Sequence, residues 1–264
     1  MEAQIKTTVK AGNSSAVILP RSWLDKDVRV ELVKKTYETM LLDVINISKR
    51  YLDLKEIIGV YLVGSYARKE EDENSDIDIL IITSNIDKEM ISEGIYNILI
   101  VSSKLLKQKL DEDLLPVGQM IKEARPLLNS DYLSSIEVKI TKKNVKWYID
   151  TTEDKLKIIK EAVKRTKKSN KNYINDAVAY TLILRIRTLY IIKKLMENQE
   201  YSKKDFVRLI KKISKGGNAY KRYLAVKNNL KDEKGISIKE AEELCEYLEN
   251  QLIHIRKFKY TTLP

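Results

Sequence analysis

The sequence predicts an α+β protein: a small β unit at the start, a small mixed sheet with helices in the middle and an all-α bundle at the end. Short runs of β-favouring residues, such as Val60–Val63 and Ile79–Ile82, lie among turn residues in the first half. From Thr151 onward, apolar residues recur instead at helical spacing, as in the stripe from Val178 to Ile192. The change of period along the chain indicates the fold class.

The amino-acid composition excludes several classes of protein. The 264 residues are enough for one large domain or two to three small ones. The single cysteine, Cys245, and the single histidine, His254, exclude a disulfide framework, a cysteine zinc site and a histidine-based metal centre. One cysteine is typical of a reducing cytosol, so we expect a cytoplasmic protein. We recognise no signal peptide and no apolar run of the ~20 residues that a membrane span needs.

Residues 1–33 predict a small β module. Gly12–Ser15 is a turn cluster, and Pro20 suits the first turn of a short helix. Its expected elements are strands at Ile5–Val9, Ala16–Leu19 and Val28–Val33 and a short helix at Arg21–Leu24. So few strands bury little apolar surface by themselves.

This module resembles the AbrB-like swapped-hairpin domain. The matching residues are Gly12-Asn13, Val17–Pro20, Trp23-Leu24 and Val28–Val30. The resemblance implies that two chains interleave their strands into one barrel, and hence a homodimer, and it also implies DNA binding. Basic residues that could meet DNA phosphates are Lys6, Lys10, Arg21 and Arg29. The alternative is a module that only dimerises.

The middle of the chain contains a pair of acids at a strand edge. A helix is expected over Thr36–Leu54, followed by the Val60–Val63 strand. Asp76 and Asp78 then run into Ile79–Ile82, and alternation along a strand places both carboxylates on one face. Their repulsion is relieved by a hard divalent cation, and Mg²⁺ usually takes one or two carboxylates plus substrate phosphates.

Gly64 and Ser65 follow the first of these strands. A glycine there lets backbone N–H groups approach an anion closely, and the Ser65 hydroxyl can donate to a phosphate oxygen. Arg68 can contact phosphate or pair with Glu70 or Glu71. A phosphate cradle that faces a metal-binding carboxylate pair is what nucleoside triphosphate chemistry requires.

These residues resemble a known signature. Gly64–Arg68 followed by Ser75–Leu80 is similar to the DNA polymerase beta-type nucleotidyltransferase superfamily, and most similar to its minimal nucleotidyltransferase branch. The branch has Gly-Ser-aromatic-Ala-Arg-Gly and then Ser-Asp-Ile-Asp-Leu, so Lys69 departs from it. The resemblance implies a nucleotidyltransferase domain over residues 36–147. It also implies transfer of a nucleoside monophosphate from an NTP, such as ATP, to RNA, protein or a small molecule.

The resemblance also assigns roles. Asp76 and Asp78 would be the catalytic ligands of Mg²⁺, with two ions expected, and Gly64, Ser65 and Arg68 would bind the nucleotide. Active members usually carry a third carboxylate on the next strand, here Ile95–Val101, where Asn97 lines up best. Glu93 could reach in instead. The rival interpretation is therefore a non-catalytic DNA-binding regulator or antitoxin built on a degenerate transferase.

The rest of the chain is expected to be mostly helical. Between the second strand and the bundle we expect helices at Asp87–Gly94, Ser102–Leu110 and Leu114–Leu128, a strand at Ile136–Ile140 and a linker at Thr141–Trp147. The bundle, residues 151–264, is expected to hold helices at 152–168, 173–198, 202–213, 217–229 and 237–258. It resembles the arrangement in kanamycin-type nucleotidyltransferases, where such a bundle helps to shape the acceptor site.

Charge divides the chain unevenly. The net charge is +11, yet residues 37–141 hold 12 Lys/Arg against 19 Asp/Glu, while residues 142–264 hold 30 against 15. The basic runs Lys164–Lys168 and Lys211–Lys212 predict that the bundle binds a polyanion, RNA such as tRNA in particular. The alternative is a lysine-rich solubilising surface.

Overall fold

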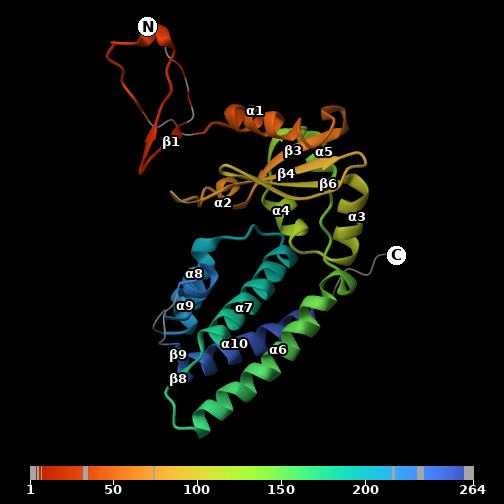
Figure 1. Cartoon of the computed structure of the whole chain (residues 1–264). Coiled ribbons are helices and arrows are strands. Elements are labelled where there is room, and N and C mark those ends of the chain that lie inside the picture. Colours follow the sequence, from red (N-terminus) through yellow and green to blue (C-terminus); the bar gives the residue numbers. More distant parts are fainter. Residues whose placement is uncertain are drawn as a thin grey trace.

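The fold combines a mixed sheet with a helical bundle. The computed structural model describes residues 4, 6, 8–31, 35–73, 75–215, 218–230 and 235–258. A five-stranded sheet has α1 (Tyr37–Ser48) on one face, and α3 (Ser103–Glu112) and α4 (Val117–Glu123) pack with the core on its other face (Figure 1). The bundle adjoins that second face. The α+β class is confirmed.

The sheet places the acidic motif at its centre. Its strands are β3 (Ile57–Val63), β4 (Ile77–Thr83), β5 (Lys88–Glu93), β6 (Tyr96–Ser102) and β7 (Arg125–Leu128). They lie in the order β5-β6-β4-β3-β7, and only the β4–β6 pair is parallel. Because β4 is central and covered on both faces, its residues read as an almost unbroken apolar run.

The two faces of the sheet have separate cores. Residues of odd number in β4, such as Ile79 and Ile81, pack with α1 through Met40 and Val44. Even-numbered residues, beginning with Leu80, belong to the core shared with α3, α4 and the bundle. Asp78 has the parity of Leu80, so it lies on the bundle side of the sheet.

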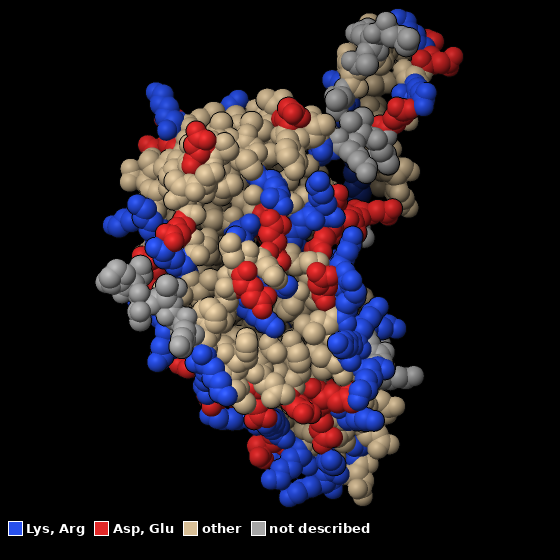
Figure 2. Space-filling view, turned by 180° about the vertical axis from the view of Figure 1, so that it is seen from behind, with Lys and Arg blue, Asp and Glu red and all other residues tan. Residues whose placement is uncertain are grey.

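The bundle holds the five predicted helices. They are α6 (Lys142–Lys168), α7 (Asp176–Met196), α8 (Lys203–Ile213), α9 (Asn218–Lys227) and α10 (Ile238–Lys257), and short strands β8 (Tyr173–Ile174) and β9 (Ile236–Ser237) pair beside them. The expected stripe on α7 is core: Leu182, Ile186, Leu189 and Ile192 are all buried. Lys and Arg side chains gather along one edge of the bundle and at its far end (Figure 2).

The helix expected over Asp87–Gly94 is wrong, because β5 occupies most of it. Gly94, at φ +59°, closes a tight turn between β5 and β6, and the two strands pair antiparallel with Ser92 opposite Asn97. Pairing with a neighbouring strand outweighs the weak helical propensity of the segment.

The expected organisation of residues 114–147 is also partly wrong. The single helix Leu114–Leu128 ends at Glu123, since Pro126 disfavours helix for the residue before it and lies in β7. Residues 136–140, all described, form no strand, and a short helix, α5 (Ser130–Ser135), precedes them.

The expected linker Thr141–Trp147 is the start of α6. Thr141 and Asn144 form a capping box, and the buried Asn144 amide also donates to the carbonyls of Leu110 and Lys139. These bonds fix the entry of the chain into the helix, which then runs unbroken past residue 151. The division into three domains stays a prediction.

The N-terminal segment forms only part of the expected module. β1 (Val9–Ala11) pairs with β2 (Ser14–Ala16) across the predicted Gly12 turn, and a short 3₁₀ helix spans Arg21–Trp23. Residues 17–19 and 28–31 form no strand, while residues 5, 7, 32 and 33 of the expected strands lie outside the described residues. The hairpin stands apart from the sheet in Figure 1. Several apolar side chains of the N-terminal segment are largely exposed, among them Ile18 by 70%, Leu24 by 71% and Val30 by 68%.

We expect deletion of residues 1–33 to convert a dimer into a monomer. The motivation is this exposed apolar set, which a second copy would cover. Light scattering coupled to size exclusion measures the mass, and circular dichroism checks that the rest stays folded. An unchanged mass would contradict the prediction. The AbrB-like likeness itself remains a prediction.

The described helices also bear on membrane association. None of them combines the length and apolarity that crossing a bilayer requires.

Candidate functional site

The predicted turn and the predicted acids lie against each other. Val63 pairs in register with Asp78, and α2 (Gly64–Ala67) begins immediately after β3. Gly64 has φ +71°, and a methyl group at this position would overlap Oδ2 of Asp78. Only glycine therefore satisfies both the backbone angle and the close approach of the carboxylate.

A row of polar side chains runs from the start of β4 across β6 to β5 beside this turn. Asp78 pairs in register with Asn97 on β6, and Nδ2 of Asn97 donates to Oδ2 of Asp76 at 3.2 Å. Ser92 on β5 donates from Oγ to Oδ1 of Asn97 at 2.8 Å. The structure thus brings together the two acids and the predicted third position, with the Asn97 amide oriented toward the carboxylates.

The carboxylates around Asp78 outnumber the cations that face it. Burial raises the pKa of Asp78; a hydrogen bond from Asn97 opposes the rise, and the charges of Asp76 and Glu123 add to it. Arg68 is the cation that lowers it. A carboxylate with a raised pKa among other carboxylates is an environment that a bound cation would stabilise.

Glu93 does not lie with these acids. It pairs in register with Tyr96, whose ring belongs to the core beneath α1, and its carboxylate forms an ion pair with Arg50. Since Ser92 faces Asn97, the next residue must face the opposite side of the sheet. Glu93 as a substitute third acid is therefore wrong.

Glu123 is the acid that sequence reasoning missed. It ends α4 with only 3% of its surface exposed. Its Oε1 accepts from the Gly64 N–H at 2.8 Å, and its Oε2 accepts from Arg68 at 2.7 Å and Gln119 at 3.1 Å. The available signal was a glutamate two residues after Ile121 and next to Ala124, both buried, within the helix expected over Leu114–Leu128.

Arg68 is held between two carboxylates. Its Nε donates to Glu70 at 3.1 Å and its Nη1 to Glu123 at 2.7 Å, and its side chain is only 10% exposed. Burial lowers the pKa of Arg68, but these carboxylates outweigh it and the net shift is upward. Of the alternatives for Arg68, the pairing with Glu70 is what the structure contains, and a phosphate contact stays a prediction.

The backbone angle at Lys69 explains why members of the resembled branch usually have glycine at this position. Its φ is +56°, in the left-handed region that glycine adopts without strain. A lysine there costs about 1–2 kcal/mol.

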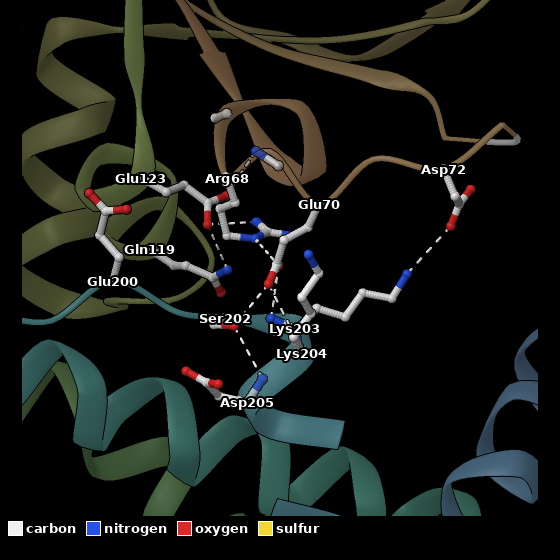
Figure 3. Close-up of polar contacts among 12 residues, drawn as sticks. Arg68, Glu70, Asp72, Gln119, Glu123, Glu200, Ser202, Lys203, Lys204 and Asp205 are labelled. Carbon is white, nitrogen blue, oxygen red and sulfur yellow. Dashed lines mark hydrogen bonds and ion pairs between the residues drawn. The ribbon is translucent and has the colours of Figure 1, made fainter. Parts of the chain in front are cut away.

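Glu70 ties the site to the bundle. Its carboxylate accepts from Oγ of Ser202 at 2.8 Å and from the backbone N–H groups of Lys203 at 2.8 Å and Lys204 at 3.2 Å, at the N-terminus of α8 (Figure 3). Burial is the largest single effect and raises the pKa of Glu70. The hydrogen bonds together outweigh it, so the net shift of the pKa is downward. The loop that leads toward Asp76 is thereby fixed to α8.

The donor set suits one kind of metal ion. Within the described part of the chain, no group of three or more Asp, Glu, His or Cys residues is arranged to hold a metal. Asp76 and Asp78 are nevertheless adjacent, and the site carries excess negative charge. Two carboxylates fit Mg²⁺, which completes its octahedron with water and substrate phosphates.

Comparison with known proteins gives a family match and two similar solved structures. The family "Nucleotidyltransferase domain" matches residues 44–234. Among solved structures, the chain is similar to a nucleotidyltransferase-like protein from Exiguobacterium sibiricum, with 14% identity, TM-score 0.37 and coverage of 81% of this chain and 75% of that one. It is also similar to spectinomycin adenyltransferase from Enterococcus faecialis, solved with ATP and spectinomycin, with 15% identity, TM-score 0.45 and coverage of 83% and 100%. A search of curated proteins found no match.

Proposed function

The chain belongs to the nucleotidyltransferase domain family, and from this premise we propose that it transfers a nucleoside monophosphate from an NTP to an acceptor, releasing pyrophosphate. The observation that carries the proposal is the contact between the Gly64 turn and the Asp78 carboxylate, with Asp76 beside it. The turn that would bind phosphate thus lies next to the acidic pair that would bind the metal, the arrangement that phosphoryl-transfer chemistry requires.

Each residue then has a role. Asp76 and Asp78 would hold Mg²⁺, two ions by the family resemblance, which neutralise phosphate charge and lower the pKa of the attacking hydroxyl. The Ser65 hydroxyl, to which no described residue hydrogen bonds, donates to a terminal phosphate oxygen. Gly64 provides close backbone approach, while its own N–H is taken by Glu123. Arg68 binds phosphate only by giving up part of its contact with Glu70 or Glu123.

The proposal also covers the substrates and the binding partners. ATP is among the NTPs, and the acceptor is RNA, a protein or a small molecule. The basic bundle is the proposed surface for RNA, and the N-terminal module is the proposed surface for DNA and for a homodimer. A cytoplasmic location is in keeping with the single cysteine.

The second candidate function is a non-catalytic regulator or antitoxin. Asn97 favours it, because an amide stands in register with Asp78, where active members usually carry a carboxylate. An amide cannot accept the proton of the attacking hydroxyl.

One assay separates the two functions. The full-length protein is incubated with Mg²⁺, each of the four labelled NTPs, and total cellular RNA or protein. Nucleotide-dependent labelling of an acceptor with release of pyrophosphate supports the transferase. Absence of labelling under all four nucleotides, together with specific DNA binding, supports the regulator.

We expect Asn97→Asp to raise the transfer rate. The new carboxylate would lie beside Asp76 and Asp78, where it serves as a base, and a well-placed base contributes about 10²–10⁴-fold. Initial rates under single-turnover conditions measure it. Ser92→Asp, which adds the same charge one strand further from Asp78, is the matched control. Equal rates for Asn97→Asp and the unaltered protein would show that this position carries no catalytic acid.

A further inference from the structure

Helix α8 begins at the candidate site and carries a row of cations away from it. Its first turn is held by Glu70, in the loop that leads toward Asp76, and Lys203 forms an ion pair with Asp72 of the same loop at 3.6 Å. Tyr201, just before the helix, packs its ring against Arg68, with 5.2 Å from the guanidinium carbon to the ring centre. The N-terminus of α8 is thus part of the wall of the site (Figure 3).

The two faces of α8 differ sharply. Phe206 and Ile210 are buried against the bundle. The exposed side chains on the opposite face are mainly basic: Lys204, Arg208, Lys211 and Lys212, and the exposed Lys215 follows the end of the helix. With 3.6 residues per turn, the four helical positions fall within about 100° of one another around the helix axis. Figure 2 shows Lys and Arg side chains along the edge of the molecule where Figure 1 places α8 and α9.

Part of this positive charge is not neutralised by the protein. Arg208 pairs with Asp205 at 2.6 Å and Lys215 with Glu243 at 3.1 Å. Lys204, Lys211 and Lys212 form no ion pair with any residue that the structure describes. They span roughly 12 Å along the helix, at a rise of about 1.5 Å per residue. Three exposed cations along a helix that begins beside the site are complementary to the phosphates of an extended nucleic-acid strand.

We infer that the acceptor of the nucleotidyl group is a single strand of RNA, whose backbone lies along α8 and whose end enters the site beside Asp76 and Asp78. This inference rests on the proposed transferase activity and names its substrate class. A strand end provides the hydroxyl that attacks the α-phosphate of the NTP; the new phosphodiester bond forms as the bond to pyrophosphate breaks. The hydroxyl proton leaves to solvent, and pyrophosphate is the other product.

The test compares two matched triple variants of the full chain. Lys204→Gln, Lys211→Gln and Lys212→Gln together remove three positive charges from α8. The control, Lys104→Gln, Lys107→Gln and Lys142→Gln, removes three from α3 and the first residue of α6, outside the two basic runs of the bundle. All six side chains are exposed, so thermal melting should show both variants folded.

Binding is measured first, without nucleotide. Fluorescence anisotropy follows a short labelled single-stranded RNA from about 50 to 300 mM salt, where counterion release is visible. Each neutralised phosphate contributes about −0.7 to the log–log slope, so the α8 variant should lose about 2 units of slope and at least tenfold in affinity at low salt. The control variant should keep both. Equal losses in the two variants, or none, would overturn the inference.

Transfer is measured separately, with labelled NTP and Mg²⁺. Labelling of the RNA that falls in the α8 variant and not in the control supports the inference. Labelling of a protein or small molecule that the α8 variant leaves unchanged overturns it while the transferase proposal stands. RNA binding along α8 with no acceptor labelled at all overturns the transferase proposal and the acceptor role with it. Lysine–phosphate contacts by themselves do not distinguish the two sugars, so labelling of the deoxyribose strand of the same sequence in place of the RNA would overturn the assignment to RNA.

Discussion

Asp76→Asn and Asp78→Asn are each expected to abolish nucleotide transfer without unfolding the protein. The two carboxylates lie at the start of the central strand β4 beside the Gly64 turn, where their charge serves the cation rather than the core. Removal of one preorganised electrostatic group typically costs about 10²–10³-fold in rate, and loss of a metal ligand should cost at least as much. Single-turnover labelling with excess Mg²⁺ measures the effect.

Stability provides the second readout for Asp78. Its pKa is raised in the folded protein, so the folded state holds its proton more tightly than the unfolded state. Stability is therefore lost as the pH rises from the ordinary pKa of an aspartate through the raised pKa of Asp78 in the folded protein. The ionised carboxylate remains unfavourable at neutral pH. Asp78→Asn removes this charge, so its melting temperature at pH 7 should equal or exceed that of the unaltered protein.

The same shift predicts the pH dependence of transfer. Asp78 binds a cation only when ionised, so the rate should fall as the pH drops through its raised pKa, and more Mg²⁺ should move that fall to lower pH. Glu89→Gln, which removes an exposed acid from β5, is the control and should keep the full rate. Wild-type turnover in either Asn variant, or a melting temperature far below wild type, would refute the metal assignment.

The largest expected loss of stability comes from Glu123→Ala. Glu123 is buried and accepts hydrogen bonds from Arg68, Gly64 and Gln119, so its removal strips Arg68 of a partner and leaves the Gly64 N–H without its acceptor. Breaking a buried ion pair by removing one partner costs about 3–5 kcal/mol. Urea denaturation followed by circular dichroism measures the change in the free energy of unfolding.

Two further variants make this result specific. Glu161→Ala removes an exposed glutamate from α6 and should change the free energy of unfolding by less than about 0.5 kcal/mol. Arg68→Met combined with Glu123→Ala should be less destabilising than the two single losses added together, because neither charge is then left unpaired. A loss below about 1 kcal/mol for Glu123→Ala would show that Glu123 does not hold the turn.

Local patterns were sufficient for much of the fold. The five bundle helices follow from apolar spacing and from glycine breaks, since a helix repeats every 3.6 residues wherever it packs. The strands around the motif follow from short β-favouring runs bounded by turns. Asp76 and Asp78 could be placed on one face because alternation is a property of the strand itself. The helix predicted at residues 87–94 was wrong because the pairing of this segment with β6 is not encoded in its local sequence.

The composition of the site was decided at longer range. The sequence by itself determined the α+β class, the Gly64 turn and the acidic pair. Only the tertiary structure placed Asn97 against Asp76, turned Glu93 to the far face, and brought Glu123 from α4 to the Gly64 N–H. The physical reason is that strand register and helix packing bring together residues that are far apart in the chain. No local period records which buried glutamate will meet which backbone donor.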